Sequence, residues 1–322
     1  MKRRSFLVGL AMTACTAALP GTAGADWPDR TITFVVPFSA GGGTDTTARI
    51  LSEKLTTELG QSIVIENRPG AGANIGAQYV ASAAPDGYTL LVATSTLATN
   101  VTLYKSLRYD LQTDLIPVSQ LLYIPNVLVV SNDVPAKTLA EFIEYARRNK
   151  GALNYGTAGN GSSQHLSAAL FSKLAQVDMV HVPYKGGAPA ANDLVAGHIQ
   201  LIFAPLVEVL SFIEAGKVRA LAVTTKNRSR RLPDLPTIGE ALPGYEIALW
   251  VGLFAPKGTS QPIVDRLGAA VRKAMAHPAV HKTVEEQGSS IVASTPEEFR
   301  PFLAAEIEKW GNLVKLSGAK IN

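Results

Sequence analysis

The chain has 322 residues, of which 47% are hydrophobic and 17% charged, a balance typical of folded globular proteins. Its formal net charge is +4, and subtracting the first three basic residues (Lys2, Arg3 and Arg4) leaves +1, which does not indicate a surface for nucleic acid or anionic membranes. The one cysteine, Cys15, lies near the N-terminus, so a disulfide framework is excluded, and so is a cysteine nucleophile in the rest of the chain. The length predicts two domains.

Residues 1–25 are typical of a signal peptide. A basic start is followed by a short apolar stretch over 6–19 and by the small residues Ala23-Gly24-Ala25, which predict cleavage before Asp26. The paired arginines leave Sec and twin-arginine export both open, and lipid attachment at Cys15 is not favoured. No later segment has the roughly twenty consecutive apolar residues of a membrane helix. We therefore expect an exported, periplasmic protein.

Strand-like and helix-like segments alternate in the first part of the chain. The order strand, helix, strand, helix, strand predicts a parallel sheet covered by helices. The segments are 31–37 (strand), 44–59 (helix), 63–65 (strand), 75–83 (helix) and 88–93 (strand).

The same alternation restarts and predicts a second α/β unit of similar size. Its expected strands are 126–131, 153–156, 179–182, 201–204 and 220–224, and its expected helices are 138–148, 162–175, 188–196 and 207–215.

The end of the chain is expected to return to the first unit. It contains a strand-like segment, 247–255, and two helical segments, 261–276 and 296–316. The chain would then cross between the units twice, near 121–130 and 245–254, and two crossings make a hinge and a cleft. We therefore predict one lobe built from 26–124 and 249–322, and a second built from 125–248.

Two Gly-rich loops that lead from a strand into a helix are the main candidates for ligand contacts. They cover 37–45 and 156–165, and ligands of open parallel sheets bind beyond the carboxyl ends of strands. Glycines let the backbone approach a ligand, and a helix N-terminus offers free N–H groups to a carboxylate. The loops lack the patterns of phosphate and dinucleotide sites. The alternative is that each is only a tight turn with a helix cap.

Further polar and aromatic residues accompany these loops. Thr94-Ser95-Thr96 places small hydroxyls at another strand end, and the hydroxyls of the second loop are Thr157, Ser162 and Ser163. Tyr184 would add an aromatic wall, and Asp45 either caps its helix or stabilises its loop.

Catalytic and metal-binding patterns are weak. Ser163, His165 and Asp193 lack the context of a nucleophile elbow, and two residues that are two apart on a helix point in different directions. His277 and His281 have helical spacing, but no third ligand accompanies them. We predict no catalytic residue, no metal and no cofactor.

At the same loops the chain resembles the Bug-type periplasmic receptors of tripartite tricarboxylate transporters. The matching stretches follow one another along nearly the whole chain: 27–28 with 32–45, 67–76, 84–91, 153–166, 182–193 and 249–258. Ala73 departs from the family, which often has glycine there.

The resemblance implies a two-lobe Venus-flytrap fold of the periplasmic-binding-protein type (type II-like), with the two chain crossings at its hinge. It also implies ligand capture by backbone amides, small hydroxyls and ordered water. Together with Tyr184, the ligand contacts that follow are Phe38, Ala40, Gly41, Gly42, Asp45, Thr94, Ser95, Thr157, Gly159, Ser162 and Ser163.

The expected function is that of an exported solute-binding protein. It would capture a small organic carboxylate (a dicarboxylate, a tricarboxylate or an aromatic acid) in the cleft, and deliver it to membrane permease subunits. We expect a monomer with no nucleic-acid partner. Two alternatives remain open: a ligand-presenting sensor for a membrane kinase, and an enzyme similar to α/β hydrolases.

Overall fold

Two groups of parallel strands form the two sides of the molecule. The structure is a computed structural model that describes residues 27–41, 43–184 and 186–320, so the expected signal peptide and Gly42 lie outside the described residues. On one side, β1 (Ile32–Val36) lies between β2 (Ile63–Asn67) and β3 (Thr89–Thr94). On the other side, β5 (Asn154–Thr157) lies between β6 (Val180–Pro183) and β7 (Leu201–Pro205).

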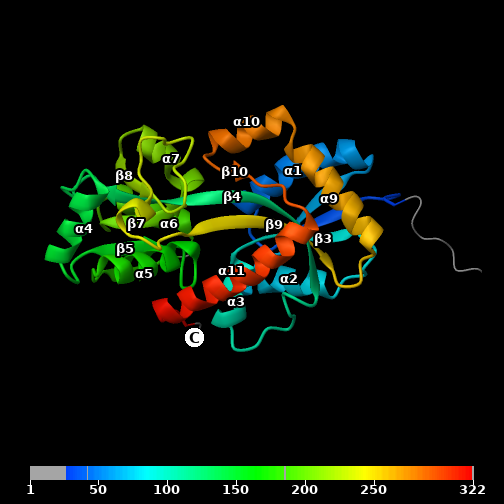
Figure 1. Cartoon of the computed structure of the whole chain (residues 1–322), viewed down its shortest axis with the longest axis horizontal. Helices are drawn as coiled ribbons and strands as arrows, with labels where there is room; N and C mark the ends of the chain where they lie inside the picture. Colours follow the sequence, from blue (N-terminus) through cyan, green and yellow to red (C-terminus); the bar gives the residue numbers. More distant parts are fainter. Residues whose placement is uncertain (1–26, 42, 185, 321–322) are drawn as a thin grey trace, which may run out of the picture.

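Two long strands join these groups. β4 (Leu115–Ser131) and β9 (Ala248–Pro256) pair antiparallel from Leu115 opposite Pro256 to Pro125 opposite Ala248. β9 also pairs antiparallel with β3, and β4 with β7 and with β8 (Val218–Val223). In Figure 1 both strands run between the two sides of the molecule. The chain therefore passes between its two sides through paired strands.

Helices cover both groups of strands. On the first side these are α1 (Gly43–Leu59), α2 (Asn74–Ala81) after the short η1 (Ala71–Ala73), α3 (Thr96–Leu103), α9 (Gln261–Met275), α10 (Pro278–Glu286) and α11 (Pro296–Ser317). On the second they are α4 (Leu139–Arg148), α5 (Ser163–Ala175), α6 (Gly187–Val195), α7 (Leu206–Glu214) and the short α8 (Ile238–Ala241). A two-residue strand, β10 (Ser290–Ile291), pairs with β4.

Local sequence explains where the helices begin. Thr138 and Glu141 form a reciprocal capping box at α4, and Thr295 and Glu298 form another at α11. Helical spacing gives α1 one buried face, which includes Leu51 and Leu55.

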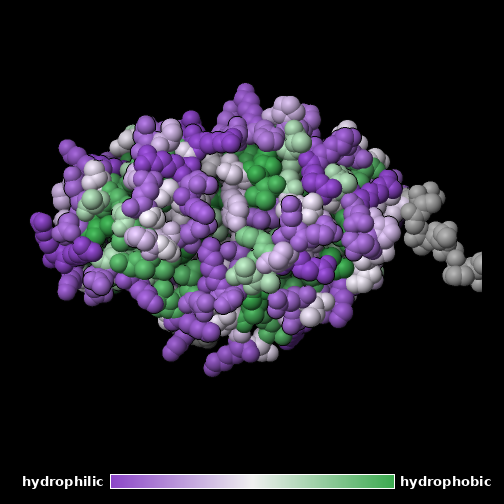
Figure 2. Space-filling view, viewed as in Figure 1, coloured by the Kyte–Doolittle hydropathy of each residue, from purple (hydrophilic) through white to green (hydrophobic). Residues whose placement is uncertain are grey.

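Apolar residues gather in four clusters. Two draw almost entirely on residues 27–124 and 247–316, and two on 128–245 together with Val127. Polar residues cover much of the face seen in Figure 2, and apolar residues show between them in patches. The division of the chain into lobes at 124/125 and 248/249 stays a prediction.

Among the described residues, no helix combines the length and the apolar character that crossing a membrane requires.

Several elements differ from the expectation. The region expected as a strand over 126–131 begins at Leu115, and α3 and α10 were not predicted. The sheet is parallel within each group, as expected for the first, but β4 and β9 make it mixed. The expected α/β class is confirmed, and α3 matters for the site because its first turn faces the cavity described next.

Candidate ligand-binding site

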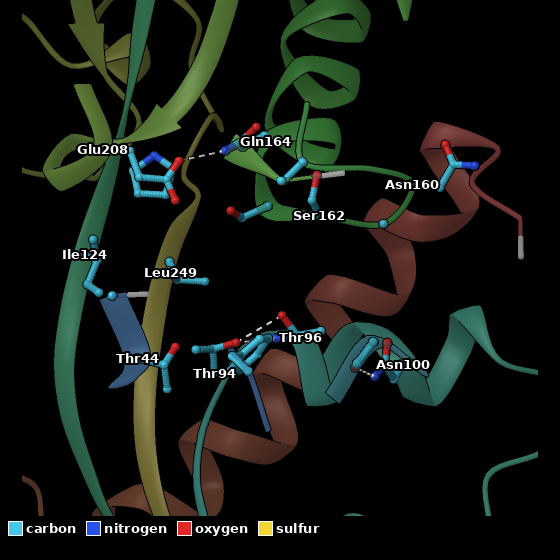
Figure 3. Close-up of a pocket in the computed structure, with 18 of the residues that line it drawn as sticks. Thr44, Thr94, Thr96, Asn100, Ile124, Asn160, Ser162, Gln164, Glu208 and Leu249 are labelled. Carbon is cyan, nitrogen blue, oxygen red and sulfur yellow. Dashed lines mark hydrogen bonds between the residues drawn. The ribbon is translucent and has the colours of Figure 1, made fainter. Parts of the chain in front are cut away.

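A cavity of about 410 Å³ lies between the two sides of the molecule. Figure 3 shows Thr44, Thr94 and Thr96 on one side of it, and Ser162, Gln164 and Glu208 on the opposite side. Ile124 of β4 and Leu249 of β9 form part of its wall. A cavity of this volume suits a small organic molecule.

Two helix N-termini line the first side of the cavity. α1 begins at Gly43, and both Gly43 and Thr44 line the cavity. α3 begins at Thr96, whose backbone N–H donates to Thr94 Oγ1 over 3.3 Å, while Thr94 Oγ1 donates to Thr96 Oγ1 over 3.0 Å. The Thr96 N–H is therefore occupied, whereas the first-turn N–H groups of α1 have no partner inside their helix, so this side offers hydrogen-bond donors.

A third helix N-terminus lines the opposite side. Ser162 caps α5, since its Oγ accepts from the His165 N–H over 3.2 Å, and it donates to the Gly159 carbonyl over 2.7 Å. Ser163, the first residue of α5, also lines the cavity. The cap therefore holds the glycine loop and the helix start in one arrangement.

Two stacked histidines support this loop from behind. The rings of His165 and His181 lie 4.1 Å apart and are nearly parallel. His165 Nδ1 accepts from the Gly161 N–H over 3.2 Å, and His181 Nε2 lies 2.7 Å from Thr157 Oγ1. Burial, assisted by His181, lowers the pKa of His165 to about 4. The neutral ring can therefore act as a hydrogen-bond acceptor for the loop.

Asp45 stabilises the first glycine loop. It is 2% exposed and accepts from the Gly41 N–H over 2.9 Å and from Asn67 Nδ2 over 3.0 Å, while Arg49 donates two hydrogen bonds to it. The Arg49 hydrogen bond, opposed by desolvation, lowers the pKa of Asp45 to about 2. Of the two roles considered for Asp45, its contacts favour stabilising the loop.

The structure brings together only part of the predicted set. Phe38, Thr94, Ser162 and Ser163 line the cavity, whereas Ala40, Gly41, Asp45, Ser95, Thr157, Gly159 and Tyr184 do not. Gly42 lies outside the described residues. Tyr184 Oη donates to Asp193 Oδ2 over 2.6 Å, which turns its polar end toward α6. That all of these residues contact the ligand stays a prediction.

Several lining residues were not predicted. Thr44 and Gln164 lie inside the loops that were singled out, so the loop pattern could have found them. Asn100 and Glu208 belong to the helices α3 and α7, and no local pattern marks them.

Glu208 is the carboxylate of the cavity wall. Its side chain is exposed to the cavity, and the surrounding walls remove part of its hydration. This desolvation raises its pKa to about 7, while a hydrogen bond from Gln164 acts in the opposite direction.

Among the described lining residues there is no Lys, Arg or His. Within the described parts of the chain, no cluster of three or more His, Cys, Asp or Glu side chains could hold a metal ion.

Comparison with known proteins shows the family. Residues 47–319 match the family described as tripartite tricarboxylate transporter family receptor. The chain belongs to this family. The periplasmic binding protein BugD is 34% identical, with a TM-score of 0.80 over 91% of this chain and 99% of BugD.

Two further solved structures contain a ligand. A Rhodopseudomonas palustris protein solved with adipate is 39% identical, with a TM-score of 0.84 over 92% of this chain and all of that one. MatC of the same species, solved with bound malate, is 38% identical, with a TM-score of 0.79 over 89% and 100% of the two chains.

These findings confirm the resemblance found in the sequence and the two-lobe periplasmic-binding-protein fold that it implied. The chain is a solute-binding receptor of a family whose members are periplasmic binding proteins and not enzymes. The alternative of a hydrolase-like enzyme is therefore not supported.

Proposed function

We propose that this receptor captures a small organic carboxylate in the cavity between its two sides, and delivers it to membrane permease subunits of a tripartite transporter. The observation that carries the proposal is the convergence of three helix N-termini, those of α1, α3 and α5, on one cavity. The structures of two relatives, with adipate and with malate, support the carboxylate class.

The donors of the cavity explain how an anion would bind without a guanidinium partner. First-turn N–H groups and the hydroxyls of Thr44, Thr96 and Ser163 are donors, and helix N-termini carry partial positive charge. Hydrogen bonds to a charged group contribute about 1.5–3 kcal/mol each, and they strengthen as water leaves an enclosed site.

Titration of the protein lacking residues 1–25 tests the carboxylate class. Succinate, malate, adipate, citrate and an aromatic acid are compared with a neutral sugar and an amine. We expect at least one acid to raise the melting temperature, because a ligand at one hundred times its Kd stabilises the fold by about 2.7 kcal/mol. Binding of only the sugar or the amine would refute the carboxylate class.

Two variants locate the binding site. Thr96→Ala and Ser163→Ala each remove one lining hydroxyl, and each is expected to weaken the binding of that acid by about tenfold. Thr113→Ala serves as the control, because Thr113 is exposed and lies outside the cavity. Equal affinity of all four proteins would place the binding site elsewhere.

Delivery to a transporter is tested in cells. We propose that residues 1–25 direct export, so the protein should appear in the periplasmic fraction as a monomer that begins at Asp26. Deletion of its gene should abolish uptake of the bound acid. Unchanged uptake with loss of a transcriptional response to the acid would favour the sensor alternative.

A further inference from the structure

The side of the cavity formed by α5 and α7 contains a pair of acceptors. Gln164 Nε2 donates to Glu208 Oε2 over 3.2 Å. Gln164 is 2% exposed, and its Oε1 has no hydrogen-bond partner among the described residues. Glu208 opens into the cavity with its remaining lone pairs, and Figure 3 shows both residues across the cavity from Thr44, Thr94 and Thr96.

Space for this pair is left by a glycine. A Cβ atom at Gly187 would overlap Glu208 Oε2 and would lie 2.8 Å from Gln164 Nε2. Gly187 is the first residue of α6 and does not have a positive φ, so its backbone does not require glycine. The close approach of the two side chains accounts for the absence of a side chain here.

The end of the cavity at Glu208 therefore differs in hydrogen-bonding character from the helix N-termini. The N-termini of α1, α3 and α5 present donors, which suit a carboxylate. The end at Glu208 presents acceptors, and its raised pKa of about 7 is the expected response to desolvation without a described cationic partner. At a pH above this pKa, a second carboxylate placed there would meet an ionised group of like charge.

We propose that Glu208 and Gln164 form a subsite for an O–H or N–H donor of the ligand, so that the receptor prefers acids that also carry a hydroxyl or ammonium group. This inference rests on the proposed function, because it places the carboxylate of the same ligand at the helix N-termini. A hydroxyl or an ammonium group satisfies the same acceptors, and a matched panel separates the two.

The test uses two series of acids that differ in one substituent. The first is succinate, malate and aspartate, and the second is adipate, 2-hydroxyadipate and 2-aminoadipate. Calorimetric titration is performed at a pH above the pKa of Glu208. In at least one series we expect the substituted acid to bind about tenfold or more tightly than the unsubstituted acid. The substituent with the larger advantage identifies the donor.

Variants show whether the subsite causes this preference. Glu208→Gln removes the charge, and Gly187→Ala displaces the carboxylate without straining the backbone, so both should reduce the advantage about tenfold. Glu214→Gln is the matched control, because Glu214 ends the same helix and pairs with Arg231 outside the cavity. Lys185→Ala is a second control. Lys185 lies outside the described residues, but it carries a positive charge and precedes the lining residue Gly186 in the sequence.

Each outcome is decisive. An unsubstituted acid that binds as tightly as its analogues overturns the subsite and leaves the proposed function intact. The subsite is also overturned if the tighter binding of the substituted acid persists in Glu208→Gln and Gly187→Ala, or if it is lost only in Lys185→Ala. If none of the six acids, nor any acid of the earlier panel, binds, the proposed function itself fails. Melting temperatures of the variants show that each is folded.

Discussion

Glu306 of the C-terminal helix α11 joins this helix to the long strand β9. It is 6% exposed, and its Oε2 accepts from Trp250 Nε1 over 3.0 Å and from Trp310 Nε1 over 2.5 Å. Its Oε1 accepts from Lys309 Nζ over 3.2 Å. Both tryptophans are 0% exposed, so no water replaces the carboxylate if it is removed. We predict that this carboxylate is a major source of stability of the first side.

The magnitude follows from the two indole N–H groups. Glu306→Leu leaves both buried without an acceptor, at about 1–3 kcal/mol each, so the free energy of unfolding should fall by about 2–6 kcal/mol. Glu306→Gln keeps one carbonyl oxygen for both donors and loses mainly the charge, so it should cost about 1 kcal/mol. Leucine and glutamine have similar helix propensity, so the helix itself does not cause the difference.

Urea unfolding followed by circular dichroism measures both losses. Glu308→Leu is the control, because Glu308 is exposed on the same helix, and it should change stability by less than about 0.5 kcal/mol. A Glu306→Leu variant as stable as Glu306→Gln would refute the reasoning, since it would show that the indole groups do not depend on this acceptor.

Three further predictions concern the loops. The pKa of His165 is about 4, below its usual 6.5, so the neutral ring stabilises the fold above pH 6.5, and up to about 3 kcal/mol of this stability is lost as the pH falls toward 4. In His165→Asn the same fall in pH should lower the free energy of unfolding by less, and an equal loss would contradict the assignment. Gly161→Ala should weaken ligand binding about tenfold or more, because φ of residue 161 is 75° and the new Cβ would overlap the side chain of Leu103 of α3. Adding Leu103→Ala should restore part of the affinity, and no recovery in calorimetric titration would argue against the overlap. Ala71→Gly should raise the free energy of unfolding in urea by up to about 1 kcal/mol, because this exposed residue has a strained φ of 46°. Ala73→Gly should gain less because the methyl group of Ala73 is buried. A loss of stability in Ala71→Gly would contradict the backbone strain.

Elements whose signal is local could be predicted from the sequence. The apolar runs of β1 and β3 and the one-sided pattern of α1 give these elements by periodicity alone. α3 was not predicted because Thr96–Leu103 contains three threonines and an asparagine, which favour helices weakly. The first half of β4 was not predicted because Pro117 and Pro125 interrupt it, and prolines usually argue against a strand.

The candidate site was predictable only in its loops. Ser162 and Ser163 follow glycines at a helix start, a pattern that sequence displays directly. Gln164 and Glu208 are 44 residues apart, and they come together because α5 packs against β7, which leads directly into α7. Tyr184 was expected to add an aromatic wall, and this stays a prediction; its hydroxyl group donates to Asp193 of α6, a contact that no local pattern marks.

The polar residues of the two loops support the proposed binding of an anion at a cavity with few charges among its described lining residues. Asp45 accepts from the Gly41 N–H and His165 from the Gly161 N–H, so both side chains hold loop backbone, and His181 stacks on His165. Because the loops are held in this way, the donors at the starts of α1 and α5 already point at one volume before a ligand arrives, and less ordering opposes binding. Loss of such a support should therefore weaken binding even though the residue does not touch the ligand. Asp45→Asn keeps the size of the side chain and weakens the pair with Arg49, so a lower affinity in this variant would separate loop support from direct contact.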